Sequence, residues 1–510
     1  MTTLSNRKSV LAIVKEVTEG TPVLPSAATD YVSLQEGYTL ESSFNELTND
    51  EIINSLAMAK GLLGLENPTA SISHYMKHSG TEGVAPEIGN LLESLFGTVE
   101  TNGTEYNTIA GSTAGTSSAR AIVKVDSAEG LTFSRGEALL IKDAVNNYSI
   151  RNVFSISTDD LSLGFNLADA PAAGVDLGKA IFYYPANESH PTLTLANYRA
   201  NGGAIELIAG ARCMEMSLDI TAGELVNAEF SLEGLSYSFN PLQVTASNTY
   251  IDYNEGGASS SIAISQDTYK DPHELAAQIQ TQLDDSAAAT ITCTYSDSTG
   301  KFTIVSDGGT FELEWKTGTN GADGTDTHIG TLLGYGDAAD DTGAVTYTGD
   351  TAIVLTSPDT PTYNANDPLV AKNNDVMIGD YDDYACFNPS SVNVTLANTK
   401  KDLLSICAES GKSGSIFTRR EVTIEVVSYL NKYDVDKFRK FRENENTAFC
   451  YNFGEKSGQN WIAGKCVNIY VPTATITAFS IADDEGVVTL NMTLKAYTDN
   501  GSGEVYLNFL

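Results

Sequence analysis

The chain has 510 residues, too many for one ordinary domain and enough for three or four. It contains 66 Asp and Glu residues against 30 Lys and Arg, and its formal net charge of −36 argues against nucleic-acid binding through phosphate contacts, which need surface cations. With 41% apolar residues, 43 glycines and 24 tyrosines, the composition is typical of a turn-rich β protein with real cores.

The cysteines and the N-terminus indicate where the protein is made. Six cysteines stand far apart with no C-x-x-C pair, so we expect buried free thiols and a reducing compartment rather than a disulfide or zinc framework. They are Cys213, Cys293, Cys386, Cys407, Cys450 and Cys466. The apolar run Val10–Val14 is too short for a signal peptide, and no segment reaches membrane-spanning length. We therefore expect synthesis in the cytoplasm and no membrane contact.

The first 120 residues combine short strands with one helix. Tyr31–Leu34 and Ile72–Lys77 alternate in polarity as strands do. Between them, Phe44–Leu65 is less regular and is expected to form a long projecting loop. Pro86–Phe96 predicts a core-facing helix, because apolar residues recur at helical spacing after a proline that suits the first helical position. Asn102–Ser118 is rich in Gly, Ser and Thr, which indicates a loop.

Two inserted domains are predicted next. Residues 121–184 contain short strand patterns separated by turns, which favours a small barrel-like β domain. Residues 249–356 predict an accessory α+β domain, with a helix capped by Asp271 and a hairpin over Ile291–Val305. The acidic, glycine-rich stretch Gly318–Asp326 is interpreted either as a mobile tip or as a cluster of turns.

Outside these insertions the chain repeats one β unit, at 1–120 plus 185–248 and at 357–510. Each unit has an alternating strand, a turn and a second strand: Met214–Ile220 with Ala228–Leu232, and Ala474–Ile481 with Leu490–Leu494. Ile208-Ala209-Gly210 and Ile462-Ala463-Gly464 open these hairpins, and a strand followed by a helix precedes each of them. We interpret the match as a duplication, the alternative being the general likeness of antiparallel hairpins.

No motif predicts a catalytic, cofactor or metal site. Gly411-Lys412-Ser413 lacks the glycine that a phosphate-binding loop needs five residues earlier, and His273-Glu274 lacks a second zinc ligand at 277. His74 and His78 lie at a strand end, about 13 Å apart along an extended chain, and are expected to be solvated. Asp323 and Asp326 lack the spacing of a calcium loop. We therefore predict that the protein is not an enzyme and holds no cofactor.

One basic cluster stands out in this acidic chain. It consists of Lys432, Lys437, Arg439, Lys440 and Arg442 on or beside a predicted helix that begins near Asp434, with Arg419 and Arg420 upstream. It is interpreted either as a solvated helix face or as a contact that steers an acidic neighbouring subunit into place. Nucleic-acid binding is the third and least favoured alternative, because the aromatic residues that would stack on bases are not interleaved with the charges.

The N-terminal part of the chain resembles the major tail tube proteins of long-tailed, non-contractile bacteriophages. The residues that carry the resemblance are Glu16-x-x-Glu19-Gly20-Thr21-Pro22, Tyr31-Val32-Ser33-Leu34 and the stretch Gly80–Glu93, in which a glycine-rich turn feeds an apolar helix. Residues 249–356 resemble a small accessory domain of phage tail proteins, through Thr268-Tyr269, the helix to Leu283 and Thr299–Ile304.

The resemblance implies a mainly β fold: two tail-tube-type β-sandwich units, each flanked by a helix, with two inserted small β-rich domains. It implies a structural subunit whose rings stack into a conduit for DNA ejection, in a virion tail. Two units per chain imply trimeric rings with pseudo-sixfold symmetry, alternatively hexameric rings. The other implied partners are the terminator, tape measure and tail tip proteins, and double-stranded DNA that passes without specific binding.

Three features of the tube follow as expectations. The lumen is acidic, the insertions point outward, and Phe44–Leu65 forms an inter-ring loop. Two other functions are compatible with an acidic β-rich chain. One is an adhesive or receptor-binding protein of a phage or a cell surface. The other is an extracellular polysaccharide enzyme, which would need paired carboxylates in a cleft.

Overall fold

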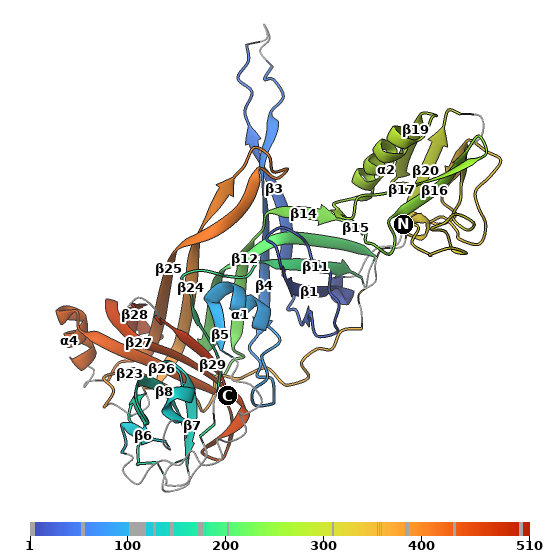
Figure 1. Ribbon diagram of the computed structural model, residues 1–510. Helices are drawn as coiled ribbons and strands as arrows, with labels where there is room; N and C mark the ends of the chain where they lie inside the picture. The colour runs from blue at the N-terminus through green and yellow to red at the C-terminus, as the bar shows by residue number, and fades with distance from the viewer. Residues whose placement is uncertain are drawn as a thin grey trace.

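The computed structural model describes residues 6–52, 57–100, 119–125, 129–142, 147–171, 177–178, 180–200, 203–308, 311–353, 355, 358, 360–382, 387–431, 435–498 and 503–510. The described chain is mainly β, as predicted, with a central sheet body and two smaller domains at its flanks (Figure 1). No described helix is long and apolar enough to cross a membrane.

One antiparallel sheet runs through the whole body and is called the main sheet below. In spatial order its strands are β3 (Thr39–Leu47), β4 (Leu62–Tyr75), β13 (Asn227–Glu233), β12 (Ala204–Thr221), β24 (Pro389–Leu404), β25 (Lys412–Tyr429), β28 (Val487–Ala496) and β27 (Asn460–Asp484). The first four strands come from the N-terminal half of the chain and the last four from the C-terminal half. If the four positions in each set are numbered in spatial order, the chain passes through positions 1, 2, 4 and 3 in both sets.

Two smaller sheets lie against one face of the main sheet. The N-terminal one contains β2 (Tyr31–Val32), β1 (Val10–Lys15), β11 (Leu193–Arg199), the first part of β12, and β14 (Ser236–Phe239). The C-terminal one contains β5 (Gly97–Glu100), β10 (Ile181–Pro185), β29 (Tyr506–Phe509), the first part of β27, β26 (Asn446–Ser457) and β23 (Asp375–Gly379). The long strands β12 and β27 thus each belong to both layers.

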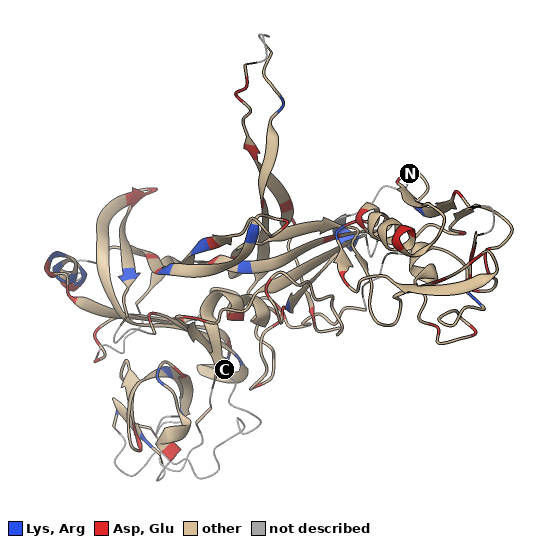
Figure 2. Ribbon diagram, turned by 45° about the horizontal axis from the view of Figure 1, so that its top comes forward, with Lys and Arg blue, Asp and Glu red and all other residues tan. Residues whose placement is uncertain are grey.

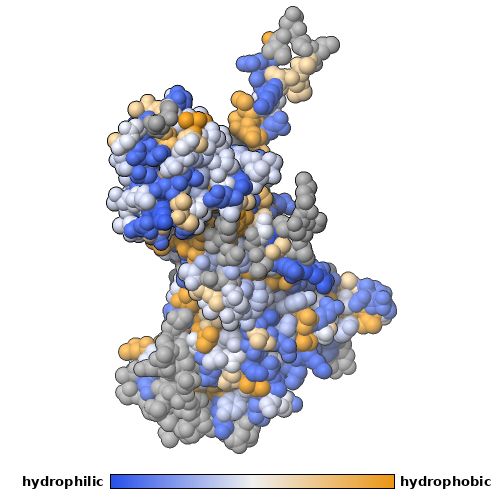
Figure 3. Space-filling view, turned by 90° about the vertical axis from the view of Figure 1, so that its right-hand side faces the viewer, coloured by the Kyte–Doolittle hydropathy of each residue, from blue (hydrophilic) through white to orange (hydrophobic). Residues whose placement is uncertain are grey.

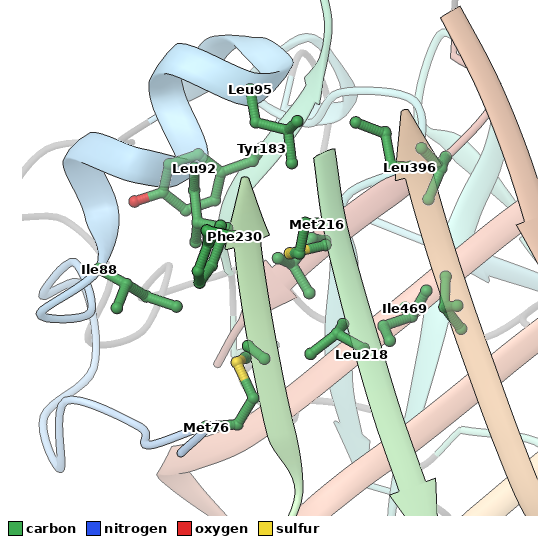
Figure 4. Packing of buried hydrophobic residues seen from close by; sticks show 14 of the residues in the cluster. Met76, Ile88, Leu92, Leu95, Tyr183, Met216, Leu218, Phe230, Leu396 and Ile469 are labelled. Carbon is green, nitrogen blue, oxygen red and sulfur yellow. The ribbon is translucent and has the colours of Figure 1, made fainter. Parts of the chain in front are cut away.

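A single large hydrophobic core fills the space between the layers. It includes Met216, Leu218 and Phe230 of the main sheet and Ile469 of the C-terminal sheet, all almost fully buried (Figure 4). Helix α1 (Gly89–Phe96) closes this core with its apolar stripe. It begins three residues later than predicted, because Pro86 instead closes a turn in which the Gly89 amide donates to the Pro86 carbonyl, 2.9 Å away.

The second helix of the body has a different environment. Helix α4 (Val435–Glu443) follows β25 and packs on β27, where the rings of Phe441 and Phe479 stack with centroids 6.0 Å apart. Phe438 remains 45% exposed on this helix. Unlike α1, α4 therefore covers the end of the body only in part.

The predicted small β domain forms an open four-stranded sheet. Its strands are β6 (Ile122–Lys124), β9 (Asp160–Gly164), β8 (Tyr148–Ser157) and β7 (Ala138–Lys142), with the short helix η2 (Glu129–Thr132). The predicted strand near 180–184 exists as β10, but it pairs with β5 and β29 in the body. The domain packs on the outer face of the C-terminal sheet, where Asn152 donates to Asn468 at 2.8 Å.

The accessory domain has its own core around the fully buried Trp315. It contains β15 (Leu242–Gln243), β16 (Tyr250–Glu255), β17 (Ala258–Ala263), β18 (Thr268–Tyr269), α2 (Pro272–Ser286), β19 (Ile291–Ser296), β20 (Lys301–Ser306), β21 (Phe311–Leu313), α3 (Gly330–Leu333) and β22 (Thr346–Thr348). The predicted Asp271 cap and the predicted hairpin are confirmed. Gly318–Asp326 is a cluster of turns closed by backbone hydrogen bonds.

The two Ile-Ala-Gly segments do not occupy equivalent places. Gly210 lies where β12 passes from the smaller sheet to the main sheet, with a φ of +65°. Gly464 lies near the start of β27, close to the turn from β26. The corresponding passage in β27 falls near Pro472 instead, between its pairing with β26 and its pairing with β28.

Gly210→Ala is expected to destabilise the body, because a Cβ would lie 2.7 Å from the Leu235 side chain and a positive φ strains any L residue. Gly223→Ala is the matched control, since Gly223 has a φ of +86° but no atom lies within 4 Å of the place where a Cβ would be added. Urea unfolding should show a loss of about 1 kcal/mol for the control and a larger loss for Gly210→Ala. Equal losses would mean that the contact with Leu235 relaxes without penalty.

Candidate functional site

The face of the main sheet that points away from the core is polar and solvent-exposed. Because strand side chains alternate, each strand that buries Val, Leu or Ile on one face presents its other residues here. Small polar residues dominate this face: Thr39, Ser71, Ser73, Ser217, Asn227, Ser231, Asn393, Thr395, Thr423, Asn491 and Thr493. The result is a broad hydroxyl- and amide-covered surface, called the polar face below.

Acidic and basic residues both occur along the strands of the main sheet (Figure 2). Exposed carboxylates that form no ion pair with a described residue are Glu41, Glu215, Asp219, Glu229 and Glu425. Three cations of these strands are already paired: Lys495 and Arg419 both contact Glu421, and Lys400 contacts Glu233 at 3.0 Å. The described carboxylates of this face that make no ion pair therefore give it an excess of negative charge.

The two halves of the chain meet at the pairing of β12 with β24. Glu215–Thr221 pairs with Ser391–Ala397 without a break in register. On the core side, Met216 and Leu218 lie beside Leu396 and Val394, and all four are buried (Figure 4). This junction joins the halves into one sheet.

Residues of the motif Glu16-x-x-Glu19-Gly20 reinforce this region. Glu19 accepts hydrogen bonds from Arg212 and Ser415, at 2.9 and 2.8 Å, and so links β12 to β25. Glu16 is buried, which raises its pKa, although amide hydrogen bonds from Gly210 and Gly20 oppose that rise. The motif holds the bend of β12 and ties it to the second half of the chain.

The two outer strands of the main sheet each have an open edge. Within the described residues, β3 pairs only with β4, and the last part of β27, Ala478–Asp484, pairs only with β28. Ile481 is 57% exposed there, and Phe479 is half-buried. Unpaired strand edges with exposed apolar side chains favour pairing with another chain.

The hairpin of β3 and β4 projects far beyond the body (Figures 1 and 3). It contains much of the predicted loop Phe44–Leu65, of which residues 53–56 lie outside the described residues. Its exposed apolar side chains are Phe44, Leu47, Ile52, Met58, Leu62 and Leu63. Such a concentration of apolar residues on an isolated arm indicates a contact surface.

The basic cluster finds its partners within the same chain. Lys440 contacts Asp380 at 2.6 Å, and Lys437 donates to the Ile378 carbonyl at 2.8 Å. Arg439 forms ion pairs with Asp436 and Glu445, at 2.9 and 2.8 Å. Arg420 is held by Glu504, Arg442 pairs with Glu443, and Lys432 lies outside the described residues. The solvated-face interpretation therefore holds for Arg419, Arg439 and Arg442, which are 67%, 44% and 63% exposed and paired with carboxylates of the same chain, whereas Lys437 and Lys440 are buried.

The histidine prediction is wrong. His74 and His78 are 2% and 1% exposed rather than solvated, and each lies beside a carboxylate: His74 beside the buried Glu87 and His78 beside Glu455, which is 42% exposed. His74 lies 3.1 Å from the Ser33 hydroxyl and 3.4 Å from Glu87, and His78 lies 3.2 Å from Glu455. Nothing in the local sequence pattern signals these partners, since Glu87 and Glu455 come from other elements.

Of the five cysteines in the described part of the chain, four agree with expectation. Cys213, Cys293, Cys450 and Cys466 are buried free thiols, Cys407 is exposed, and Cys386 lies outside the described residues. Burial raises the pKa of Cys293, Cys450 and Cys466 to about 12, which leaves these thiols unreactive. Among the described residues, no three His, Cys, Asp or Glu side chains are placed to hold a metal ion.

Comparison with known proteins identifies the family. The family model described as phage tail tube protein matches residues 6–326, more than half of the chain. The chain therefore belongs to the phage tail tube protein family, whose members are structural components of the virion tail. A solved chain from the virion of a native gene transfer agent particle shares 14% identity, over 27% of this chain and 95% of its own, with a TM-score of 0.19. No curated protein matches the sequence.

Glu87→Gln is expected to reduce stability in a pH-dependent way. Burial opposes ionisation of Glu87, but hydrogen bonds from His74 and Ser33 outweigh it and lower its pKa below the ordinary 4.5. The ionised carboxylate therefore stabilises the fold above pH 4.5, and this stabilisation disappears as pH falls through the lower folded pKa. Denaturant unfolding should show the variant about 1–2 kcal/mol less stable at pH 7. The gap between variant and parent should close in acid, and a gap that stays constant with pH would contradict this assignment.

Proposed function

We propose that this chain is the tail tube subunit of a long-tailed, non-contractile phage, with two tube units in one polypeptide. The units are 1–120 plus 185–248 and 357–510, with 121–184 and 249–356 inserted as separate domains. The identical order of pairing in the two four-strand sets supports a duplication: β3-β4-β13-β12 in one and β24-β25-β28-β27 in the other. In each set, a helix follows the second strand.

The observation that carries the proposal is a sheet built from two equal sets that remains open at both ends. Further copies can continue it until the sheet closes on itself. With about 4.8 Å between strands and a tilt near 40°, three chains of eight strands close a cylinder about 50 Å wide between backbones. Six chains would give about 100 Å. Since the narrower cylinder encloses a single DNA duplex with less empty space around it, the trimeric ring with pseudo-sixfold symmetry fits a DNA conduit better than the hexameric one.

In such a ring the polar face lines the lumen. The smaller sheets and both inserted domains lie on the other side of the main sheet, and so outside the tube. Carboxylates such as Glu215 and Glu229 then repel DNA phosphates over about 8 Å at cellular salt. Hydroxyl and amide groups keep the wall hydrated, and a wall without an excess of cations lacks the counterion release that holds proteins on DNA, so DNA passes without specific binding during ejection.

The projecting hairpin of β3 and β4 is proposed as the contact between stacked rings. Its exposed apolar side chains lie on an arm that leaves the body along the sheet, where a second ring would lie. At the ends of the stack, the same surfaces would meet the terminator and tail tip proteins, and the tape measure protein would fill the lumen before DNA does. The subunit is made in the host cytoplasm and ends in the virion.

An adhesive or receptor-binding role is the second candidate. Only the two inserted domains, with cores of their own, favour it. An isolated adhesin would not explain the open edges of the main sheet, because unpaired strand edges favour pairing with another chain.

Electron microscopy of the purified protein tests the proposal. Rings or tubes with three chains per ring, and six similar units in projection, are expected. Isolated globular particles at high concentration would overturn it, and true sixfold chain symmetry would overturn the trimeric arrangement.

Neutralising the polar face should slow DNA passage. The variant Glu215→Gln, Asp219→Asn, Glu229→Gln and Glu425→Gln is expected to assemble normally, because these side chains are exposed and make no ion pair with a described residue. Phages that carry it should eject DNA more slowly in vitro, most clearly at low salt where repulsion is strongest. Four matched changes in the accessory domain, Asp285→Asn, Glu312→Gln, Asp323→Asn and Asp337→Asn, should leave ejection unchanged, because these carboxylates also make no ion pair with a described residue. Equal slowing by both sets would exclude a lumenal role.

A further inference from the structure

The junction inside the chain defines a register that can be transferred to a second copy. Pairings across the N-terminal set align Thr39, Ser71, Ser231 and Glu215 in one row. Pairings across the C-terminal set align Asn393, Glu425, Thr493 and Ala478 in the same way.

A shared irregularity shows that these rows correspond. β12 has a bulge between Cys213 and Glu215 where it pairs with β13. β27 has one between Ile476 and Ala478 where it pairs with β28. Both bulges immediately precede the row residue, so Glu215 corresponds to Ala478 and Thr39 corresponds to Asn393.

The junction then shows how one set follows another. Glu215 pairs with Ala397, which lies four residues beyond Asn393, the member of the row on β24. Each set of four strands is therefore staggered by four residues relative to the previous one. A four-residue stagger over four strands corresponds to a tilt of about 35°, which lies in the range of closed barrels.

We infer that β27 of one copy pairs with β3 of a second copy in this same register. Ala478 then lies opposite Ser43 of the second copy, Ser480 opposite Glu41, Ile481 opposite Leu40, and Ala482 opposite Thr39. This inference rests on the proposed ring and specifies which edges meet and at which residues.

Burial supports the assignment of these edges. Met216 and Leu218, at the junction inside the chain, are 2% and 0% exposed. Their counterparts by row, Phe479 and Ile481, are half-buried and 57% exposed. A second copy of β3 would cover both, with Leu40 meeting Ile481 as Val394 meets Leu218. The partly exposed Phe438 on α4 lies beside Phe479, with ring centroids 5.5 Å apart, and extends the same apolar surface.

Disulfide trapping tests the register. Ala482→Cys with Thr39→Cys, in a Cys407→Ser background, places the two thiols on facing residues, within the Cα separation that a disulfide needs. Mild oxidation of assembled protein should give covalent dimers and trimers on a denaturing, non-reducing gel, and no larger species, because three links close the ring. The control pair Ala482→Cys with Ser43→Cys is four residues, about 13 Å, out of register and should stay monomeric.

Each outcome has a distinct meaning. Linkage of the control pair in place of the first pair, or no linkage although rings are seen by microscopy, would overturn the register while leaving the tube intact. A ladder beyond three chains would overturn closure by three copies. Absence of rings from the parent protein would overturn the proposed function itself.

A single substitution gives a second readout without cysteine chemistry. Ile481→Asp should leave the melting temperature of the unassembled chain close to that of the parent, since the side chain is 57% exposed, but should abolish rings. Leu131→Asp is the control, because Leu131 is 82% exposed on the small β domain and should assemble as the parent does. Normal assembly of Ile481→Asp would contradict the proposed edge.

Discussion

The structure depends on the backbone pairing between β12 and β24. Seven consecutive residues on each strand pair there, in the middle of a sheet whose two halves are contributed by distant parts of the sequence. Without it, β12 and β24 would each present an unpaired edge with buried-type side chains, and the large core would split into two smaller ones. Arg212, Glu19 and Ser415 add hydrogen bonds around this pairing, which makes the relative position of the halves a property of the fold.

The same strands supply both stability and the functional surface. Along β12, Met216 and Leu218 face the core while Glu215 and Asp219 face solvent, so one alternating sequence encodes two roles. A shift of one residue in any strand would place carboxylates in the core, which strongly specifies the register. The long strands β12 and β27 add a third role, because each continues from the main sheet into the layer that covers it.

Local patterns in the sequence predicted the elements better than their partners. The Asp271 cap, the hairpin at Ile291 and the alternating strands near Met214 and Ala474 follow from residue spacing alone, and the structure contains them. Partners that lie far away in the sequence could not be predicted in the same way. Strand β10 has the same alternating pattern as the strands of the small domain, but it pairs with β29. Nothing near His74 in the sequence indicates that its side chain will be buried beside Glu87. The partners of charged residues were the hardest to predict. The sequence shows a basic cluster on α4 but not its counter-charges, because Asp380, which binds Lys440, lies sixty residues away. The net charge alone predicts that an acidic surface exists. Which residues form it can be said only when the pairing of the strands is known.

A junction formed inside one polypeptide changes how a ring would nucleate. Two units that are already joined lose no translational or rotational freedom when they meet, whereas separate subunits lose the equivalent of several kcal/mol at each encounter. A cylinder of six units would then need two encounters between chains in place of five, because the last interface closes within the assembly, and the concentration at which rings begin to appear would fall accordingly. In the proposed ring of three chains, covalent pairing would also fix the order of units around the circumference, so that the inserted domains would recur in a regular threefold pattern.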